Sequence, residues 1–460
     1  MMISMVYHMK NILLSATMLL CAATMTAQPS HDDFIRNAAV CGDNYYAYPE
    51  PVGVTMTPAP EGYTPCYLTH YGRHGSRWLI GRSAYDTFYD KLREAEDSAQ
   101  LTPLGRKLMA QLDTLRQYAR GREGELTHLG AVQHRGIAHR MYENFPMLFQ
   151  AGGKVEARSS TVIRCILSMT SELAELQGLS PSLQMDIDAA VLDMSYINSK
   201  EKWNKGKKDD KRGDGNGVDT FRQRHFSPVR LLNTLFASED YWRRHIEHPT
   251  RFVIDNLWKL SASMQGIDVD KQTDLSQYFT SDEQYGIWLA RNAEWYVSHG
   301  PSTKGISTQM QRQRHLLRNL VEKADSCLAL INQKASHPET SLQPVTASLR
   351  FGHEVVVMPM VCALNLDGYG TCYDDLEQLE QKGWYSYRIF PMGSNIQMVF
   401  YRPTSQKGDV LVKALLNEHE ATMPQLTPAY GKVYYKWSDV RDYIVGKIKE
   451  YDAAYEEAKE

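Results

Sequence analysis

Short apolar segments alternate with helix-forming segments at both ends of this 460-residue chain, and this alternation restricts the possible folds more than any other feature. Residues 124–145 begin as a loop and continue as a helix, residues 355–364 form a helix or a buried run, and a terminal helix starts at Trp437. The segments that we interpret as strands are 66–71, 154–160, 345–351, 396–402 and 410–416. Strands that alternate with helices indicate a layered α/β architecture.

The middle of the chain contains few β-branched runs and many helix-forming residues. Thr280 precedes Glu283 by three positions, which is the spacing of a helix-capping box. Farther on, one apolar stripe at helical spacing is best interpreted as core and comprises Leu317, Leu320, Val321, Ala324, Leu328 and Ile331. We therefore predict that a mainly helical insertion, residues 186–340, separates two parts of one α/β domain, residues 28–185 and 341–460.

A basic loop lies within this insertion. Residues 199–212 contain Lys200, Lys202, Lys205, Lys207, Lys208, Lys211 and Arg212. Such a run is usually a solvated surface. The alternative is that the loop binds a polyanionic substrate.

The N-terminus has the pattern of a secretory signal. Lys10 is followed by an apolar run and then by small residues that include Ala22 and Ala27. We predict a signal peptide over residues 1–27, with cleavage after Ala27, and hence an exported protein that is periplasmic or secreted. The apolar run is too short to span a bilayer, and no other long apolar stretch follows, so we expect no membrane anchor in the mature chain.

Charge and cysteine content restrict the function further. The net charge of −3 gives no overall field for nucleic acid, so any basic site must be local. Six cysteines remain after the predicted signal, and either disulfides or buried free thiols are compatible with export. Because the chain has no C-x-x-C pair, a structural zinc site is not expected.

The segment LTHYGRHGSRW, residues 68–78, places Arg73, His74 and Arg77 directly after a predicted strand. Guanidinium groups bind phosphate oxygens in pairs and remain charged at any working pH. A neutral imidazole is a nucleophile for phosphorus. The pattern R-H-G-x-R therefore indicates a phosphoryl site in which both arginines hold oxygens, His74 attacks, and Gly75 lets the backbone approach the anion.

A second segment with chemical potential is ARSSTVIRCILSM, residues 157–169. Arg158 lies at the end of a predicted strand, so we expect it to enter the same pocket from a neighbouring strand. Arg164 and Ser168 are four residues apart on the following helix and share a face. For them we expect a helix-surface pairing or an orienting role.

A third segment places His353 and Glu354 directly after the predicted strand 345–351. Ligands of open α/β sheets bind at the carboxyl ends of the strands, which is where this pair falls. A phosphate monoester needs its leaving oxygen protonated, and Glu354 is the candidate general acid. His353 is a further candidate phosphate ligand.

Together these segments resemble the histidine acid phosphatase family, the larger branch of the histidine phosphatase superfamily. The resemblance rests on R-H-G-x-R at 73–77, on GELTHLG with Gln133 and His134, and on R-S-S-x-x-x-R-x-x-x-S at 158–168. The segments FPMGSNIQMVFYR and LLNE resemble the multiple inositol polyphosphate phosphatase members of that family. The motifs follow the order of the family along nearly the whole mature chain.

The resemblance implies a fold and a mechanism. The fold would be a central, mostly parallel sheet flanked by helices on both faces, with the inserted helices as a cap. The reaction would pass through a phosphohistidine without metal or cofactor. The residues that the resemblance implies are His74 as nucleophile, Glu354 as proton donor, and Arg73, Arg77, Arg158 and His353 as the phosphate pocket.

The chain departs from the family pattern at the third motif. Most of the family has His-Asp there, and the inositol polyphosphate branch has His-Ala-Glu, whereas this chain has His353-Glu354. Pro359 keeps its offset from His353, so the carboxylate has shifted and the helix has not. Glu is longer than Asp by one methylene group, and this length is able to offset the earlier position of the carboxylate in the chain.

Several alternatives remain open at the sequence level. The substrate is a small-molecule phosphate ester or polyphosphate, either an inositol polyphosphate or a sugar phosphate handled with broad specificity. Two hypotheses assign the chain to other functional classes: a protein that binds a phosphorylated ligand without turnover, and an exported glycan-binding protein. His128, His134 and His139 suggest a metal cluster, but His134 and His139 do not share a helix face well, so a polar helix surface is the default interpretation.

Overall fold

The computed structural model describes residues 30–150, 152–201, 217–267, 273–304, 308–341, 343–405 and 407–458. The predicted signal peptide and most of the basic loop 199–212 lie outside the described residues, so both remain predictions. Among the helices that are described, none is long and apolar enough to cross a membrane.

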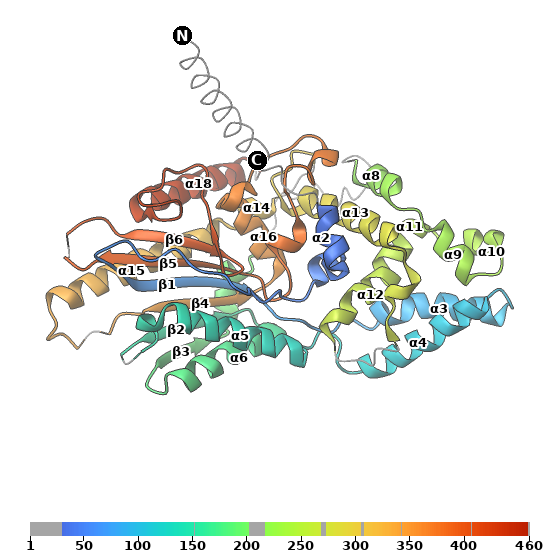
Figure 1. The fold of residues 1–460 in the computed structure, drawn as a ribbon, viewed down its shortest axis with the longest axis horizontal. Helices are drawn as coiled ribbons and strands as arrows, with labels where there is room; N and C mark the ends of the chain where they lie inside the picture. Colours follow the sequence, from blue (N-terminus) through green and yellow to red (C-terminus); the bar gives the residue numbers. More distant parts are fainter. Residues whose placement is uncertain are drawn as a thin grey trace, which may run out of the picture.

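A sheet of eight strands forms the centre of the larger of two lobes (Figure 1). The strand order over the described residues is β3-β2-β4-β1-β5-β6-β7, with β8 beside β6. The strands are β1 (Tyr63–Arg73), β2 (Lys154–Ser159), β3 (Gln184–Asp188), β4 (Ala347–Gly352), β5 (Asn395–Pro403), β6 (Leu411–Leu416), β7 (His419–Ala421) and β8 (Tyr435–Lys436).

The sheet is parallel on one side of β1 and antiparallel on the other. β3, β2, β4 and β1 pair in parallel, whereas β5, β6, β7 and β8 join by antiparallel pairing. The α/β class is therefore confirmed, but the expectation of a mostly parallel sheet is corrected to a partly parallel one. Only residues 404–410 connect β5 to β6, and a parallel crossover needs a longer connection.

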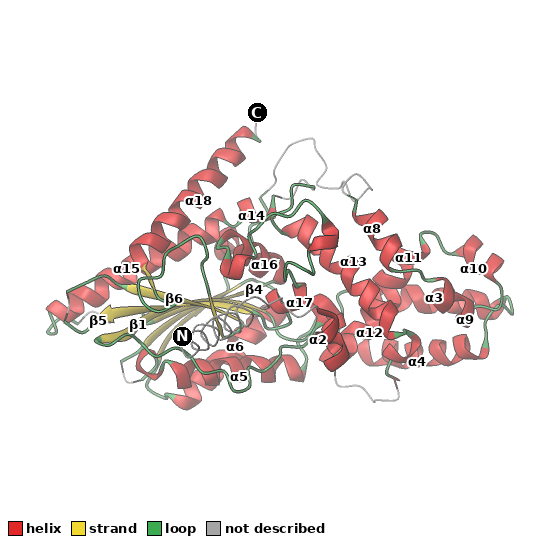
Figure 2. Ribbon diagram, turned by 45° about the horizontal axis from the view of Figure 1, so that its top comes forward, coloured by secondary structure: helices red, strands yellow, loops and turns green. Residues whose placement is uncertain are grey.

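Helices cover both faces of the sheet (Figures 1 and 2). α5 (His128–Asn144) and α6 (Ile163–Leu179) pack together on one face. On the other face lie α15 (Arg314–Ser336), α16 (Glu354–Ala363) and α18 (Trp437–Glu457). Successive residues of β1 serve the two layers, because Tyr67 belongs to the apolar cluster beneath α15 and α16 and Leu68 to the cluster beneath α5 and α6.

The smaller lobe is helical and has a hydrophobic core of its own. Leu92 and Leu112 pack there in one cluster with Leu232 and Leu257, which are distant in sequence. Its helices are α3 (Ser83–Asp97), α4 (Pro103–Ala119), α9 (Val229–Leu235), α10 (Glu239–His245), α11 (Pro249–Phe252), the π-helical η5 (Val253–Trp258) and α12 (Lys259–Ser263).

The apolar clusters draw the domain boundary differently from the prediction. α3 and α4, which fall in the predicted core 28–185, belong to the helical lobe. α15, which falls in the predicted insertion 186–340, buries its apolar stripe against the sheet layer. The difference arises because composition identifies a helix but does not reveal which layer receives its apolar face.

α13 (Ser281–His299) connects the two lobes, since Ile287 lies in the core of the helical lobe and Tyr296 in that of the sheet lobe. The predicted capping box is present at its start, with both Thr280 and Glu283 making their bonds. The remaining elements include α2 (Ser30–Arg36), η1 (Ala38–Tyr45), α7 (Met194–Ile197), α8 (Val218–His225), α14 (Gln309–Arg312) and α17 (Ser386–Ile389).

The cysteines of the described residues are free thiols. Cys372 is exposed, and the other five are buried. Of the two readings left open above, the structure supports buried free thiols. The fold is therefore stabilised by packing and hydrogen bonding without cross-links among these residues.

Candidate active site

The candidate site forms where the parallel strands β1 and β4 end side by side. Arg73, the last residue of β1, pairs with Gly352, the last residue of β4. His74 follows β1, and its backbone N–H donates to the carbonyl of Gly352 at 3.0 Å. His353 and Glu354 follow β4, so the two sequence motifs converge as expected for the carboxyl end of a parallel sheet.

His74 has the tautomer that a nucleophile needs. Its Nδ1 lies 2.9 Å from the carbonyl oxygen of Gly75, and because a carbonyl can only accept, Nδ1 must carry the hydrogen. Nε2 is then left with its lone pair and has no hydrogen-bond partner. Burial holds the pKa of His74 well below 6.5, and the neighbouring charges of Arg73, Arg164 and Arg77 lower it further. Burial and the neighbouring cations therefore both favour the neutral form of the ring.

Three guanidinium groups surround this imidazole. Arg73 is fully buried and donates from Nη1 to the carbonyl of Phe390 at 2.8 Å, while Arg77 donates to the carbonyl of Trp78 at 3.0 Å. Burial, together with the other guanidiniums, lowers the pKa of Arg73 and of Arg164. Buried donors normally have partners, yet Nη2 of Arg73 and Nε of Arg77 and of Arg164 have none. Such a cluster of unsatisfied cationic donors is a binding site for an oxyanion.

Glu354 provides the local negative charge. Its Oε2 lies 3.1 Å from Nε of Arg73 and 3.7 Å from Nε2 of His74. Burial by itself raises the pKa of Glu354, but the charges of Arg73, Arg77 and His353 outweigh it and lower the pKa to about 2. The carboxylate thus lies beside Nε2 of His74, where the oxygens of a phosphoryl group would have to bind for that nitrogen to attack phosphorus.

His353 closes the other side of the cluster. Its ring centroid is 5.6 Å from that of His74, and its Nε2 lies 3.3 Å from Oγ of Ser160. Sγ of Cys165 is 3.7 Å from the same nitrogen. Burial is the main cause that lowers the pKa of His353 to about 4; the guanidiniums act in the same direction, and Glu354 opposes them. Ser160 and Cys165 therefore orient an imidazole that is neutral above about pH 5.

Arg158 is not part of this cluster, which corrects the sequence prediction. Its guanidinium donates to the carbonyl and the carboxylate of Asp186 on β3 and lies 3.6 Å from Glu156. Along β2 the side chains alternate, and Arg158 shares the face of Lys154 and Glu156. The contacts that the structure gives for the guanidinium of Arg158 are therefore with β2 and β3, and none is with the residues at the end of β1.

Arg164 takes the place that Arg158 was expected to hold. It lies in the first turn of α6, directly after the strand end, and its charge acts on His74, His353 and Arg73. Ser168, one turn later, accepts a hydrogen bond from the backbone N–H of Gly75 at 3.1 Å. The position of Arg164 in the sequence could have identified it, because the first helical turn after a parallel strand lies at the ligand-binding edge of the sheet.

Gly75 is required for a different contact from the one expected. A Cβ at Gly75 would lie 2.5 Å from the backbone oxygen of Gly130 in the first turn of α5. The backbone of the R-H-G-x-R loop therefore packs directly on the backbone of α5. Gln133 fixes the same contact by accepting from the N–H of Ser76 at 2.9 Å.

The histidines of α5 do not converge on a metal site. His134 is fully buried, and its Nδ1 lies 2.7 Å from Glu172, so the expectation of a polar helix surface is wrong for this residue. His139 is at the surface with Glu175. In the part of the chain that the structure describes, His74, His353 and Glu354 have ligand atoms within 4.8 Å of one another, but three adjacent guanidiniums disfavour a cation there.

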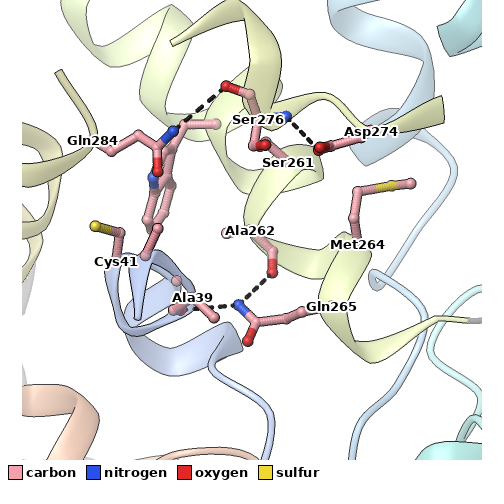
Figure 3. A pocket seen from close by; sticks show the side chains of 12 residues that line it. Ala39, Cys41, Ser261, Ala262, Met264, Gln265, Asp274, Ser276 and Gln284 are labelled. Atoms are coloured by element: carbon pink, nitrogen blue, oxygen red, sulfur yellow. Dashed lines mark hydrogen bonds between the residues drawn. The ribbon is translucent and has the colours of Figure 1, made fainter. Parts of the chain in front are cut away.

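A separate cavity of about 450 Å³ lies between η1 and α12 (Figure 3). Its lining includes Cys41, Trp258 and Met264 but none of the residues of the cluster around His74. Gln265 joins its two walls by donating to the carbonyls of Ala39 and Ala262, at 3.2 and 3.0 Å. This cavity contains no group that resembles the phosphoryl chemistry of the cluster.

Comparison with known proteins gives one family. A profile of the family described as "Histidine phosphatase superfamily (branch 2)" matches residues 73–417. The solved multiple inositol polyphosphate phosphatase of Bifidobacterium longum, in complex with inositol hexasulfate, is similar with a TM-score of 0.70 at 19% identity, covering 87% of this chain and 96% of that chain. The phytase from D. castellii gives 0.59 at 13% identity, with 93% and 89% covered. No curated protein sequence matches the chain.

Proposed function

Because this chain belongs to branch 2 of the histidine phosphatase superfamily and is a histidine acid phosphatase, we propose that His74 is the nucleophile and Glu354 the proton donor of its reaction. The observation that carries the proposal is that Nε2 of His74 has no hydrogen-bond partner and lies among three guanidiniums, of which those of Arg73 and Arg77 are buried and that of Arg164 is half-buried. The activity is phosphomonoester hydrolysis. The intermediate and the substrate class are the parts that we propose.

In the first step Nε2 of His74 forms a bond to phosphorus and the bond from phosphorus to the ester oxygen breaks. Glu354 gives its proton to the departing alcohol. In the second step water attacks the phosphohistidine, Glu354 takes a proton from that water, and inorganic phosphate leaves. Arg73, Arg77 and Arg164 act on the non-bridging oxygens, where charge must be stabilised in phosphoryl transfer.

This mechanism requires Glu354 to move away from Arg73. In the free protein the carboxylate contacts Arg73 and has a pKa of about 2, so it is ionised under any useful assay condition. A phosphoryl group that takes its place removes the guanidinium partner and adds a negative neighbour. Both changes raise the pKa of a carboxyl. Binding of the substrate is thereby coupled to uptake of the proton that the leaving group later receives.

For the substrate we propose inositol polyphosphates. The support is the resemblance of the segments 390–402 and 415–418 to inositol polyphosphate phosphatases and the shared fold with the enzyme from Bifidobacterium longum and with the phytase from D. castellii. A sugar-phosphate or broad-specificity phosphatase is the alternative. A panel of these esters measured at several pH values decides between them, and a kcat/KM that is no higher for inositol hexakisphosphate than for glucose phosphates contradicts our proposal.

We also propose that the protein is exported, on the basis of the signal pattern in residues 1–27. N-terminal sequencing of the protein recovered outside the cytoplasm tests this directly. The expected first residue is Gln28, and recovery of the uncleaved chain from the cytoplasm alone would contradict export.

The nucleophile is tested with phosphate-labelled substrate. Rapid quenching without acid is expected to leave label on the wild-type protein, because phosphohistidine is labile to acid, and peptide mapping is expected to place the label on His74. His74→Ala should form no labelled protein and lose at least about 10³-fold in kcat. A variant that retains a tenth of the wild-type rate shows that the nucleophile is elsewhere.

A further inference from the structure

A buried turn with strained backbone lies close to the candidate site. Asn417 and Glu418 connect β6 to β7, and both have left-handed backbone, with φ of 51° and 66°. Both are almost fully buried. Residues other than glycine adopt this conformation at a cost and retain it where surrounding contacts enforce it, which is often at functional sites.

The side chain of Asn417 holds both ends of one segment, residues 388–395. Its Nδ2 donates to the carbonyls of Arg388 and Ile389, at 2.7 and 3.2 Å. Its Oδ1 accepts from the backbone N–H of Asn395 at 3.0 Å. The backbone N–H of Asn417 adds a bond of 2.8 Å to the carbonyl of Asn395.

The same segment supports the site residues at the end of β1. The carbonyl of Phe390 accepts from Nη1 of Arg73 at 2.8 Å. The carbonyl of Ser394 accepts from the backbone N–H of Arg73 at 2.7 Å, and the N–H of Gly393 donates to the carbonyl of His74 at 3.0 Å. A path thus runs from the side chain of Asn417 by a hydrogen bond to Ile389, along the backbone to Phe390, and by a second hydrogen bond to the guanidinium of Arg73.

Glu418 keeps the turn in its strained form. Its carboxylate accepts two hydrogen bonds from Arg140, at 2.7 and 2.8 Å, and one from the hydroxyl of Tyr48 at 2.7 Å. Tyr48 in turn accepts from Nδ2 of Asn395 at 3.1 Å. Both residues of the turn are therefore tied to the segment that they support, and a shift of either one would be transmitted to it.

We propose that Asn417 is a positioning residue of the phosphatase reaction, which sets the direction of the Arg73 guanidinium through the carbonyl of Phe390. The inference rests on the proposed role of Arg73 as a phosphate ligand. When a phosphoryl group displaces Glu354 from Arg73, the bond to Phe390 still holds the guanidinium. The orientation of the two guanidinium N–H groups toward the phosphoryl oxygens then depends on how firmly residues 388–390 are held in place.

The test is a double-mutant cycle between Asn417→Gly and Arg73→Lys. Glycine accepts the left-handed backbone but removes the side-chain bonds. We expect Asn417→Gly alone to lower kcat/KM by roughly ten- to hundredfold, since small misplacements of positioning groups have effects of that size, and to weaken inhibition by inorganic phosphate. In the Arg73→Lys background, which no longer has the fork, the same change should cost less than about threefold.

Asn365→Gly is the matched control. Asn365 also has left-handed backbone, with φ of 48°, and its side chain binds the N–H of Gly370 and Oε1 of Gln425, at 2.9 and 3.1 Å. It lies just beyond the other end of α16. Its replacement is expected to lower Tm but to leave kcat/KM within twofold of wild type. The control therefore distinguishes a general loss of stability from a misorientation of the Arg73 guanidinium.

Effects of Asn417→Gly that are equal in both backgrounds overturn the inference and leave the proposed function in place. Retention of turnover by His74→Ala instead overturns the proposed function. If Asn417→Gly is not recovered as folded protein, Asn417→Asp tests the same link. That variant keeps the acceptor for Asn395 but loses the donor to Arg388 and Ile389, and a rate within twofold of wild type would then refute the proposal.

Discussion

Replacing Glu354 by glutamine should make the site bind an inorganic anion more tightly. The carboxylate oxygen Oε2 lies 3.1 Å from Nε of Arg73 and 3.7 Å from Nε2 of His74, the proposed nucleophile. An oxyanion must therefore compete with it for the same guanidinium. Glu354→Gln keeps the shape of the side chain and removes its charge, so the arginines become available without a competing carboxylate.

The size of the effect follows from the pKa of Glu354, which is about 2 instead of the ordinary 4.5. A shift of this size corresponds to on the order of 3 kcal/mol of interaction with the surrounding charges. Since this folded-state pKa is depressed, the stabilisation is fully present above pH 4.5 and is lost as the pH falls through about 2. At pH 6 a bound anion must give up much of that interaction, so we expect Glu354→Gln to bind sulfate about ten- to hundredfold more tightly.

Sulfate is the suitable probe because it remains a dianion across the pH range of the assay. Calorimetric titrations between pH 6 and 4 should show wild-type affinity rising with acidity, because the displaced Glu354 takes up a proton, and a weaker rise in Glu354→Gln. His353, with a pKa of about 4, contributes to both proteins. The other charged or titratable groups that interact with Glu354 remain in place in the variant; they are Arg73, Arg77, His74, Arg164, His299, Tyr71 and Cys165.

The reasoning is refuted if the two proteins bind sulfate within twofold of each other at pH 6. It is also refuted if their affinities depend on pH in the same way. Either result means that Glu354 does not occupy the anion position in solution, whatever its role in proton transfer.

Two further predictions concern residues that the sequence placed differently. Arg164→Ala should lower kcat/KM by about 10²–10³-fold, as loss of one stabilising donor does, whereas Arg158→Ala should keep kcat/KM within twofold of wild type because Arg158 binds Asp186. Steady-state kinetics with an aryl phosphate measures both variants, and a larger loss in Arg158→Ala than in Arg164→Ala would contradict the proposed phosphate pocket. Gly75→Ala should destabilise the protein by about 1–3 kcal/mol in thermal or denaturant unfolding through overpacking, whereas Gly178→Ala, with nothing within 4 Å of its Cβ, should not.

The sequence was sufficient to predict the strands whose ends form the candidate site. Each predicted strand is present, and the positions of His74, His353 and Glu354 at strand ends were enough to expect that they meet. This succeeded because parallel strands place their carboxyl ends at one edge, so a motif at the end of a strand has a defined location before any contact is known.

Arg158 and Arg164 show where the same reasoning fails. Both lie at or just after the end of β2, but the guanidinium of Arg158 binds Asp186 of the neighbouring strand β3, whereas Arg164 lies beside the imidazoles. The partner of Arg158 was not readable, because Asp186 lies on β3, an edge strand whose polar, exposed residues lack the apolar pattern of a buried strand.

The assignment of helices to the two lobes differs from the sequence-based expectation for another reason. α3 and α4 are amphipathic helices that either lobe could bury, and their partners, such as Leu232 and Leu257, lie more than a hundred residues later in the chain. The conformation of Glu354 likewise depends on groups from several segments. The sequence established that a carboxylate follows His353, but only the three-dimensional arrangement shows that it contacts Arg73.

The pairing of β1 has a consequence for how this protein can be altered. From Leu68 to Gly72 the strand bonds to β4 on one side and to β5 on the other, so the imidazole of His74 follows a strand that is paired along both edges. The helical lobe has a separate core. That core also contains Trp78, whose carbonyl accepts from Arg77, so engineering of the helical lobe should begin at positions far from Trp78, where substitutions are expected to leave the anion-binding groups in place.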